Sequence, residues 1–315
     1  MLQKKLVKWS LLFFFVVALG GAFVLFRTEL LQEKDLLKSP SSQRCQECHG
    51  PIHEKWKASR HAGAWTSEGY KKETENYTKM KCLGCHNPQE ITDGEKPLPR
   101  EEHKEEGVSC AACHLKEGAM RGPYQVFSPP HPSKEDPWYR RSESCRGCHA
   151  KTFKEWEAAR VGKTCQACHM PGKKEKMIRK FPLDLLPFHH PVEVGDHSMP
   201  VILVTEKEAR LGISREPEGD VKVVLENTGV PHALPTAENG DPRLYLEVEF
   251  FDGETLLSTE KTLFAPQLET ALRYQKTWES SLRVPEGSDR AVATLFLRRS
   301  WKKEKELLLA KEARF

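Results

Sequence analysis

The chain begins with a long apolar run. No charged residue interrupts Trp9 to Phe26, whereas three lysines precede it and Arg27 follows it. At about 1.5 Å per helical residue, such a run spans most of the ~30 Å hydrocarbon layer of a bilayer. It predicts a transmembrane anchor at 9–26, with 1–8 in the cytoplasm and the remainder outside, because positive charge favours the cytoplasmic side. A cleaved signal peptide is the alternative.

Strict alternation of apolar and polar residues marks the C-terminal part. Leu244 to Phe250 alternates in this way, and Asp252-Gly253 then supplies a hairpin turn. Val221 to Glu226 and Ala291 to Arg299 have the same strand character and lie between clusters of proline and glycine. Residues 201–300 are therefore predicted to form an antiparallel, β-sandwich-like domain.

Helical spacing occurs in two segments that repeat one another. Residues 45–63 align with residues 145–163, and in each copy a tryptophan, Trp56 or Trp156, recurs with apolar neighbours at helical spacing. Each copy predicts a helix. His53 of the first copy is replaced by Phe153 in the second, and this aromatic exchange predicts a packing role for His53.

All ten cysteines lie in five copies of Cys-x-x-Cys-His. Each copy is typical of a c-type haem attachment site, in which two thiols bind the haem covalently and the histidine ligates its iron. Zinc pairs, dithiol redox centres and disulfides are alternatives, but zinc does not require a histidine after every pair and disulfides do not repeat one spacing. The sequence predicts five covalently bound haems c, attached at Cys45, Cys48, Cys82, Cys85, Cys110, Cys113, Cys145, Cys148, Cys165 and Cys168, with His49, His86, His114, His149 and His169 as proximal iron ligands.

The motifs leave little polypeptide for a core of side chains. Between Cys45 and His169 the chain has about 25 residues per motif. Closely packed haems are therefore expected to form the interior of residues 45–200, with the two tryptophans against them or in a side-chain core. With a charged tether at 27–44 and a charged tail with a short helix at 301–315, the fold class is α + β: a transmembrane helix, a mostly helical or irregular pentahaem domain and a β domain.

The net charge of +4 changes once haem is included. A ferric haem with ionised propionates adds about −1 and a ferrous one about −2, so the loaded chain carries roughly −1 when oxidised and roughly −6 when reduced. The basic polypeptide therefore does not indicate binding of nucleic acid.

Thirteen histidines are more than five haems need. His61 is replaced by Val161 in the repeat, so the second copy requires its distal ligand from elsewhere. Methionines at 80, 120, 177 and 199 are alternative ligands that would raise the potential. Beyond the proximal set, the candidates for the second axial position are His53, His61, His103, His131, His189, His190, His197 and His232.

These motifs resemble the multihaem c-type cytochromes related to cytochrome c-554 and hydroxylamine oxidoreductase. The likeness lies in W-x-x-S-x-H-A at Trp56–Ala62, G-V-S-C-A-A-C-H at Gly107–His114, C-Q-A-C-H-M-P at Cys165–Pro171 and N-T-G-V-P-H-A-L-P-T at Asn227–Thr236. The resemblance implies that a histidine in a loop of the β domain reaches a haem. It makes His61, His197 and His232 distal ligands; His131 is the expected fourth, and His103 is preferred to His189 and His190 as the fifth.

Three functions fit these features. The first is electron transfer by a membrane-anchored pentahaem cytochrome on the outer face of the cytoplasmic membrane, with redox proteins, the quinol pool or a membrane oxidoreductase complex as partners. The second is an oxidoreductase that acts on a small nitrogen or sulfur compound at an open haem site. The third is a quinol dehydrogenase. The first is preferred, because every motif ends in histidine and spare histidines exceed the five that are needed.

Overall fold

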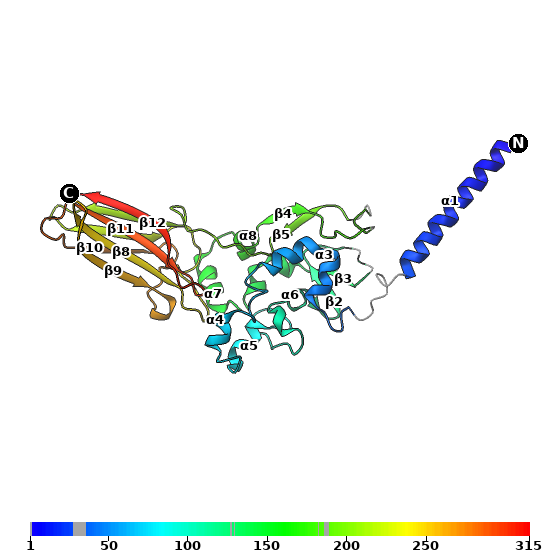
Figure 1. Ribbon diagram of the computed structural model, residues 1–315, viewed down its shortest axis with the longest axis horizontal. Coiled ribbons are helices and arrows are strands. Elements are labelled where there is room, and N and C mark those ends of the chain that lie inside the picture. The colour runs from blue at the N-terminus through cyan, green and yellow to red at the C-terminus, as the bar shows by residue number, and fades with distance from the viewer. Residues whose placement is uncertain (1, 28–35, 127, 129, 182, 186–188) are drawn as a thin grey trace. The chain divides into compact units, whose positions relative to one another are not determined.

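The computed structural model describes residues 2–27, 36–126, 128, 130–181, 183–185 and 189–315 (Figure 1). The chain divides into two compact units. Unit 1 comprises Met1–Ile91, Pro97–Arg140 and Lys173–Ser198, and unit 2 comprises Thr92–Lys96, Arg141–Gly172 and Met199–Phe315. The first three Cys-x-x-Cys-His motifs belong to unit 1. The last two belong to unit 2 together with the β domain, whereas the sequence predicted one domain for all five.

Helix α1 (Leu2–Arg27) corrects the prediction of a membrane anchor. Among the residues that the structure describes, none of the helices combines the length and the apolar character needed to cross a bilayer. The transmembrane helix at 9–26 and the single-pass location on the cytoplasmic membrane are therefore wrong. Of the predicted tether, residues 28–35 lie outside the described residues.

Short helices and turns dominate unit 1. Its buried apolar cluster, Ile91, Val108 and Trp138, is small, in keeping with an interior that side chains do not fill alone. A three-stranded sheet, in the order β1-β2-β3, and the pair β4-β5 complete the unit. The elements are α3 (Ser42–Lys57), α4 (Glu68–Glu73), α5 (Met80–His86), η1 (Lys104–Glu106), α6 (Cys110–His114), β1 (Leu115–Lys116), β2 (Ala119–Gly122), β3 (Ser133–Glu135), η2 (Pro137–Arg140), β4 (Gly172–Glu175), η4 (Leu183–Leu185) and β5 (Val192–Gly195).

Unit 2 combines four short helical elements with two antiparallel sheets. One sheet has the order β10-β7-β6 and the other β12-β11-β8-β9. The elements are η3 (Ser142–Cys145), α7 (Ala150–Ala159), α8 (Cys165–His169), β6 (Ala209–Arg215), β7 (Val221–Asn227), β8 (Arg243–Asp252), β9 (Thr255–Phe264), η5 (Pro266–Leu268), β10 (Thr277–Leu282), β11 (Arg290–Arg298) and β12 (Glu306–Arg314).

Side chains alternate in burial along the strands of unit 2, as the sequence predicted. Every second residue of β7, β8 and β11 is buried. Leu225 from one sheet and Phe250 from the other belong to the same buried cluster, so the two sheets enclose one core. The hairpin at Asp252-Gly253 is confirmed: it joins β8 to β9, and Gly253 has a φ of 56°, a value that a residue without a side chain adopts readily.

The C-terminal segment differs from its prediction. Instead of a tail with a short helix, Glu306–Arg314 forms strand β12 and pairs antiparallel with β11. Because β12 is an edge strand, most of its side chains remain exposed or half-buried, and Leu309 is the buried one. This is why its charged composition did not indicate a strand.

Candidate haem sites

Helix geometry gathers the three reactive side chains of the third and fifth motifs. Cys110–His114 forms α6 and Cys165–His169 forms α8, and residues three and four apart lie on the same face of a helix. Both cysteines and the histidine of these motifs therefore face one side, where one macrocycle would be held. Ser109 and Thr164 fix the starts of α6 and α8, since each side-chain oxygen accepts a hydrogen bond from a backbone N–H of the first turn.

A backbone carbonyl orients three of the proximal imidazoles. Nδ1 of His49 lies 2.9 Å from the carbonyl oxygen of Met177, Nδ1 of His86 2.7 Å from that of Ala64, and Nδ1 of His114 2.7 Å from that of Arg121. A proton on Nδ1 that is donated to a carbonyl leaves Nε2 as the lone-pair nitrogen, the tautomer that binds a metal.

Three proximal histidines each face a second histidine. The ring centres of His49 and His131 lie 6.5 Å apart, with the ring planes tilted by 33°. The His114 and His197 rings are 6.2 Å apart with a tilt of 32°. In unit 2, the His169 and His232 rings are 6.4 Å apart with a tilt of 19°. All three second histidines are candidate distal ligands from the sequence.

These separations match two axial ligands of one iron. With metal–nitrogen bonds of about 2 Å and each ring centre a further ~1.2 Å away, two trans imidazoles have ring centres about 6.4 Å apart. Directly packed imidazole rings would lie closer, as the stacked Tyr70 and His86 rings do at 3.8 Å. The residues therefore fit a haem iron between the members of each pair.

The second histidines are oriented in the same way as the proximal ones. Nδ1 of His197 lies 2.8 Å from the carbonyl oxygen of Gly195, and Nδ1 of His232 lies 2.9 Å from that of Ala233. His131 instead has the hydroxyl oxygen of Ser133 at 3.1 Å from its Nδ1. For His197 and His232 this leaves Nε2 available for the metal, whereas Nε2 of His131 lies 3.4 Å from the hydroxyl oxygen of Ser128.

Burial keeps the paired imidazoles neutral. Desolvation, together with the neighbouring His197, lowers the pKa of His114 to about 4. Burial also lowers the pKa values of His49, His169, His197 and His232. At neutral pH these rings therefore carry no proton on the nitrogen that would bind iron.

Motifs are joined in pairs within each unit. The Cys45 and Cys110 side chains lie close enough to influence each other's pKa, and so do those of Cys145 and Cys165. The first and third motifs, and the fourth and fifth, therefore lie side by side. The backbone N–H of Cys110 donates to Ser42 at 3.2 Å, and that of Cys165 donates to Ser142 at 3.0 Å.

The second motif has aromatic neighbours. The Tyr70 ring stacks on the proximal His86 with an angle of 7° between the planes. Tyr70 is buried, and among the described residues its hydroxyl has no hydrogen-bond partner. Burial, together with Cys82 and Cys85 nearby, raises its pKa to about 12. An orphaned polar atom beside both cysteines fits a cofactor attached there.

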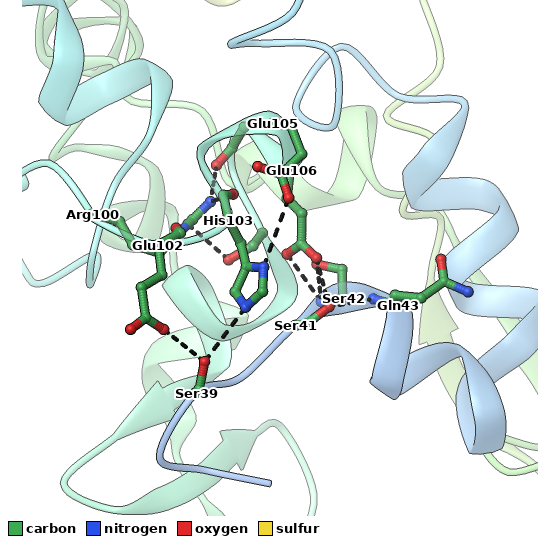
Figure 2. Close-up of polar contacts among 11 residues, drawn as sticks. Ser39, Ser41, Ser42, Gln43, Arg100, Glu102, His103, Glu105 and Glu106 are labelled. Atoms are coloured by element: carbon green, nitrogen blue, oxygen red, sulfur yellow. Dashed lines mark hydrogen bonds and ion pairs between the residues drawn. The ribbon is translucent and has the colours of Figure 1, made fainter.

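His103 lies in a cluster of polar side chains (Figure 2). Its ring lies 3.5 Å from the Ser39 hydroxyl and 3.7 Å from the Glu105 carboxylate. The Arg100 guanidinium donates to the carbonyl oxygens of His103 and Gly107 and so holds this loop in place. In the same cluster, the Glu106 carboxylate accepts from the N–H of Ser42 at the start of α3. His103 as a distal ligand stays a prediction, as does His61.

The repeat explains His53. Its ring packs on Trp56 with centres 5.4 Å apart and a tilt of 47°, and Phe153 packs on Trp156 at 5.4 Å and 46°. His53 is buried. The packing role that the sequence predicted for this position is confirmed.

Sequence reasoning missed Asn227, which supports the loop that carries His232. This residue is fully buried at the end of β7. Its Nδ2 donates to the carbonyl oxygens of His232, at 2.9 Å, and Leu272, at 3.1 Å, and its Oδ1 accepts from the N–H of Val230. An asparagine at the end of a strand was the available signal, but such residues are common in turns.

Comparisons with known proteins agree with this geometry. Residues 44–115 match the family model described as cytochrome c554 and c-prime. The fold is similar to the crystal structure of a penta-heme cytochrome c552 from Thermochromatium tepidum, with a TM-score of 0.62 and 18% sequence identity over 89% of this chain and 100% of that chain. None of the curated proteins matches the sequence. With its five Cys-x-x-Cys-His motifs and these matches, the chain is similar to multihaem c-type cytochromes.

Proposed function

We propose that this chain carries five haems c and transfers electrons through them, with three of the irons each held between two histidines. The proposed pairs are His49 with His131, His114 with His197, and His169 with His232. The observation that carries the proposal is their common ring separation of 6.2–6.5 Å. The bound haems supply one-electron chemistry, and the chain holds, orients and shields them.

Two imidazoles on one iron favour a carrier over an enzyme. A haem with both axial positions filled by protein has no position for a substrate. Because carbonyl and hydroxyl oxygens orient five of the six paired imidazoles in advance, we expect little rearrangement on a change of oxidation state. Because two motifs lie side by side in each unit, their haems would be close neighbours. Electron tunnelling requires such near contact. Redox proteins are the proposed partners.

The proposal is tested by the spin state of the purified, haem-loaded protein. We expect an absorbance and electron paramagnetic resonance spectrum dominated by low-spin ferric haem, unchanged by added nitrite or hydroxylamine. Intact mass should show five attached haems. Turnover of either compound, or a high-spin signal from most of the haems, would contradict the proposal and favour the oxidoreductase instead.

Replacing a proposed distal ligand gives a sharper result. We expect His232→Ala to convert one of the five haems to a high-spin form, because it removes one of the two imidazoles from that iron. His53→Phe is the matched control: it removes a buried histidine whose counterpart in the repeat is already Phe153. The control should remain low-spin. If both variants keep the parent spectrum, His232 is not a ligand.

A further inference from the structure

Glu155 connects helix α7 to the loop that carries His232. It lies six positions after the proximal His149. One of its carboxylate oxygens, Oε2, accepts two hydrogen bonds from the loop: one from the N–H of Ala233 at 3.1 Å and one from the hydroxyl of Thr236 at 2.8 Å. A carboxylate that accepts from both a backbone N–H and a hydroxyl is a strong, directional anchor.

Both contacts bear directly on the orientation of the His232 ring. Nδ1 of His232 is held by the carbonyl oxygen of Ala233, the same residue whose N–H is bound by Glu155. The carboxylate therefore fixes the short stretch of backbone that aims the imidazole. Two further links join the same helix and loop: Thr152 lies 3.0 Å from Thr236 between hydroxyl oxygens, and the N–H of Lys151 donates to the Glu238 carboxylate at 2.7 Å.

Unit 1 repeats the arrangement with the charges reversed. Lys55, the counterpart of Glu155 in the repeat, lies six positions after the proximal His49. Its ammonium group is 2.7 Å from the carboxylate of Glu175 in β4. Strand β4 pairs with β5, which ends at Gly195, and the carbonyl oxygen of Gly195 orients the His197 ring.

The two instances share a rule. In each unit, a charged side chain lies six positions after the proximal histidine of the first motif of a pair. This side chain binds the segment that carries a distal histidine, and that histidine faces the second motif of the pair. His197 faces His114 in unit 1, and His232 faces His169 in unit 2. Lys55 and Glu155 occupy one position of the repeat, carry opposite charges and bind corresponding segments, which indicates a role in positioning those segments.

We infer that Glu155 is a positioning residue for the sixth iron ligand of the fifth haem, acting through the backbone at Ala233. This inference rests on the proposed ligation of that haem by His232. When Glu155 is absent, the loop loses the acceptor for two donors, and the imidazole is no longer held over the iron.

The test compares variants of the haem-loaded protein by their spin state. Glu155→Ala should convert one of the five haems to a high-spin form, as His232→Ala does, and added imidazole should restore the low-spin spectrum. Glu155→Gln should stay low-spin, because its amide oxygen still accepts both hydrogen bonds. Glu157→Ala, a change at an exposed position of the same helix, is the matched control and should be unchanged.

A milder variant covers the case in which Glu155→Ala does not fold. Thr236→Val removes one of the two donors to Glu155 and should give a smaller high-spin fraction. The inference is overturned if Glu155→Ala and Thr236→Val both keep every haem low-spin while His232→Ala loses one. If His232→Ala itself leaves the spectrum unchanged, the proposed ligation fails and takes this inference with it.

Discussion

At the scale of single residues, two serines join the haem attachment motifs in pairs. Ser42 and Ser142 lie at corresponding positions just before the two copies of the internal repeat, three residues before a motif cysteine, and both are fully buried. Each accepts a hydrogen bond from the first cysteine of another motif. The sequence displays the repeated serine but not its partner, because Cys110 is 68 residues away from Ser42. Cysteines and proximal histidines were predictable because their chemistry is local.

Ser142→Ala tests this link. The change leaves the N–H of Cys165 without its acceptor, which should lower the free energy of unfolding by about 1–3 kcal/mol. Chemical denaturation followed by far-ultraviolet circular dichroism measures the loss. Ser214→Ala, at an exposed position of β6, should change the stability by less than about 0.5 kcal/mol. Equal stability of the two variants would remove the serine from this account.

At the scale of elements, the loop between β7 and β8 is the one that serves a site. The alternation of apolar and polar residues predicted the strands that flank this loop. The family resemblance predicted that His232 points from the loop toward a haem. Neither revealed how the loop is held. Asn227 supports it from the side of the β core, and Glu155 supports it from α7. Such contacts join residues far apart in sequence, so periodicity does not report them.

Asn227→Ala should damage both the β domain and the site. It removes the Asn227 partner of the His232 carbonyl oxygen and of the Val230 N–H, and one of the two donors to the Leu272 carbonyl oxygen, at an expected cost of about 2–4 kcal/mol in the free energy of unfolding. The same variant should show a partly high-spin haem, because the His232 backbone is released. Thr228 lies in the same loop, and its hydroxyl donates an exposed hydrogen bond to the carbonyl oxygen of Lys207. Thr228→Ala serves as the control and should have little effect on either measurement. A variant as stable and as low-spin as the parent would contradict this assignment.

At the scale of the whole molecule, the motifs are divided between two units, three in one and two in the other. The sequence placed all five in one domain because they lie in one continuous stretch, between Cys45 and His169. It also assigned the apolar N-terminal run to the membrane, which the described part of α1 does not support. The chemistry of each motif did not depend on either assumption.

The central claim is that each facing pair of histidines holds one haem iron. The most direct measurement is the set of iron–Nε2 distances in a crystal structure of the haem-loaded protein, with the irons located by anomalous scattering. The account predicts an iron about 2 Å from both imidazoles in the pairs formed by His49 and His131, His114 and His197, and His169 and His232. An iron bound to the proximal histidine but well beyond bonding distance of its facing histidine, in any of the three pairs, would contradict it.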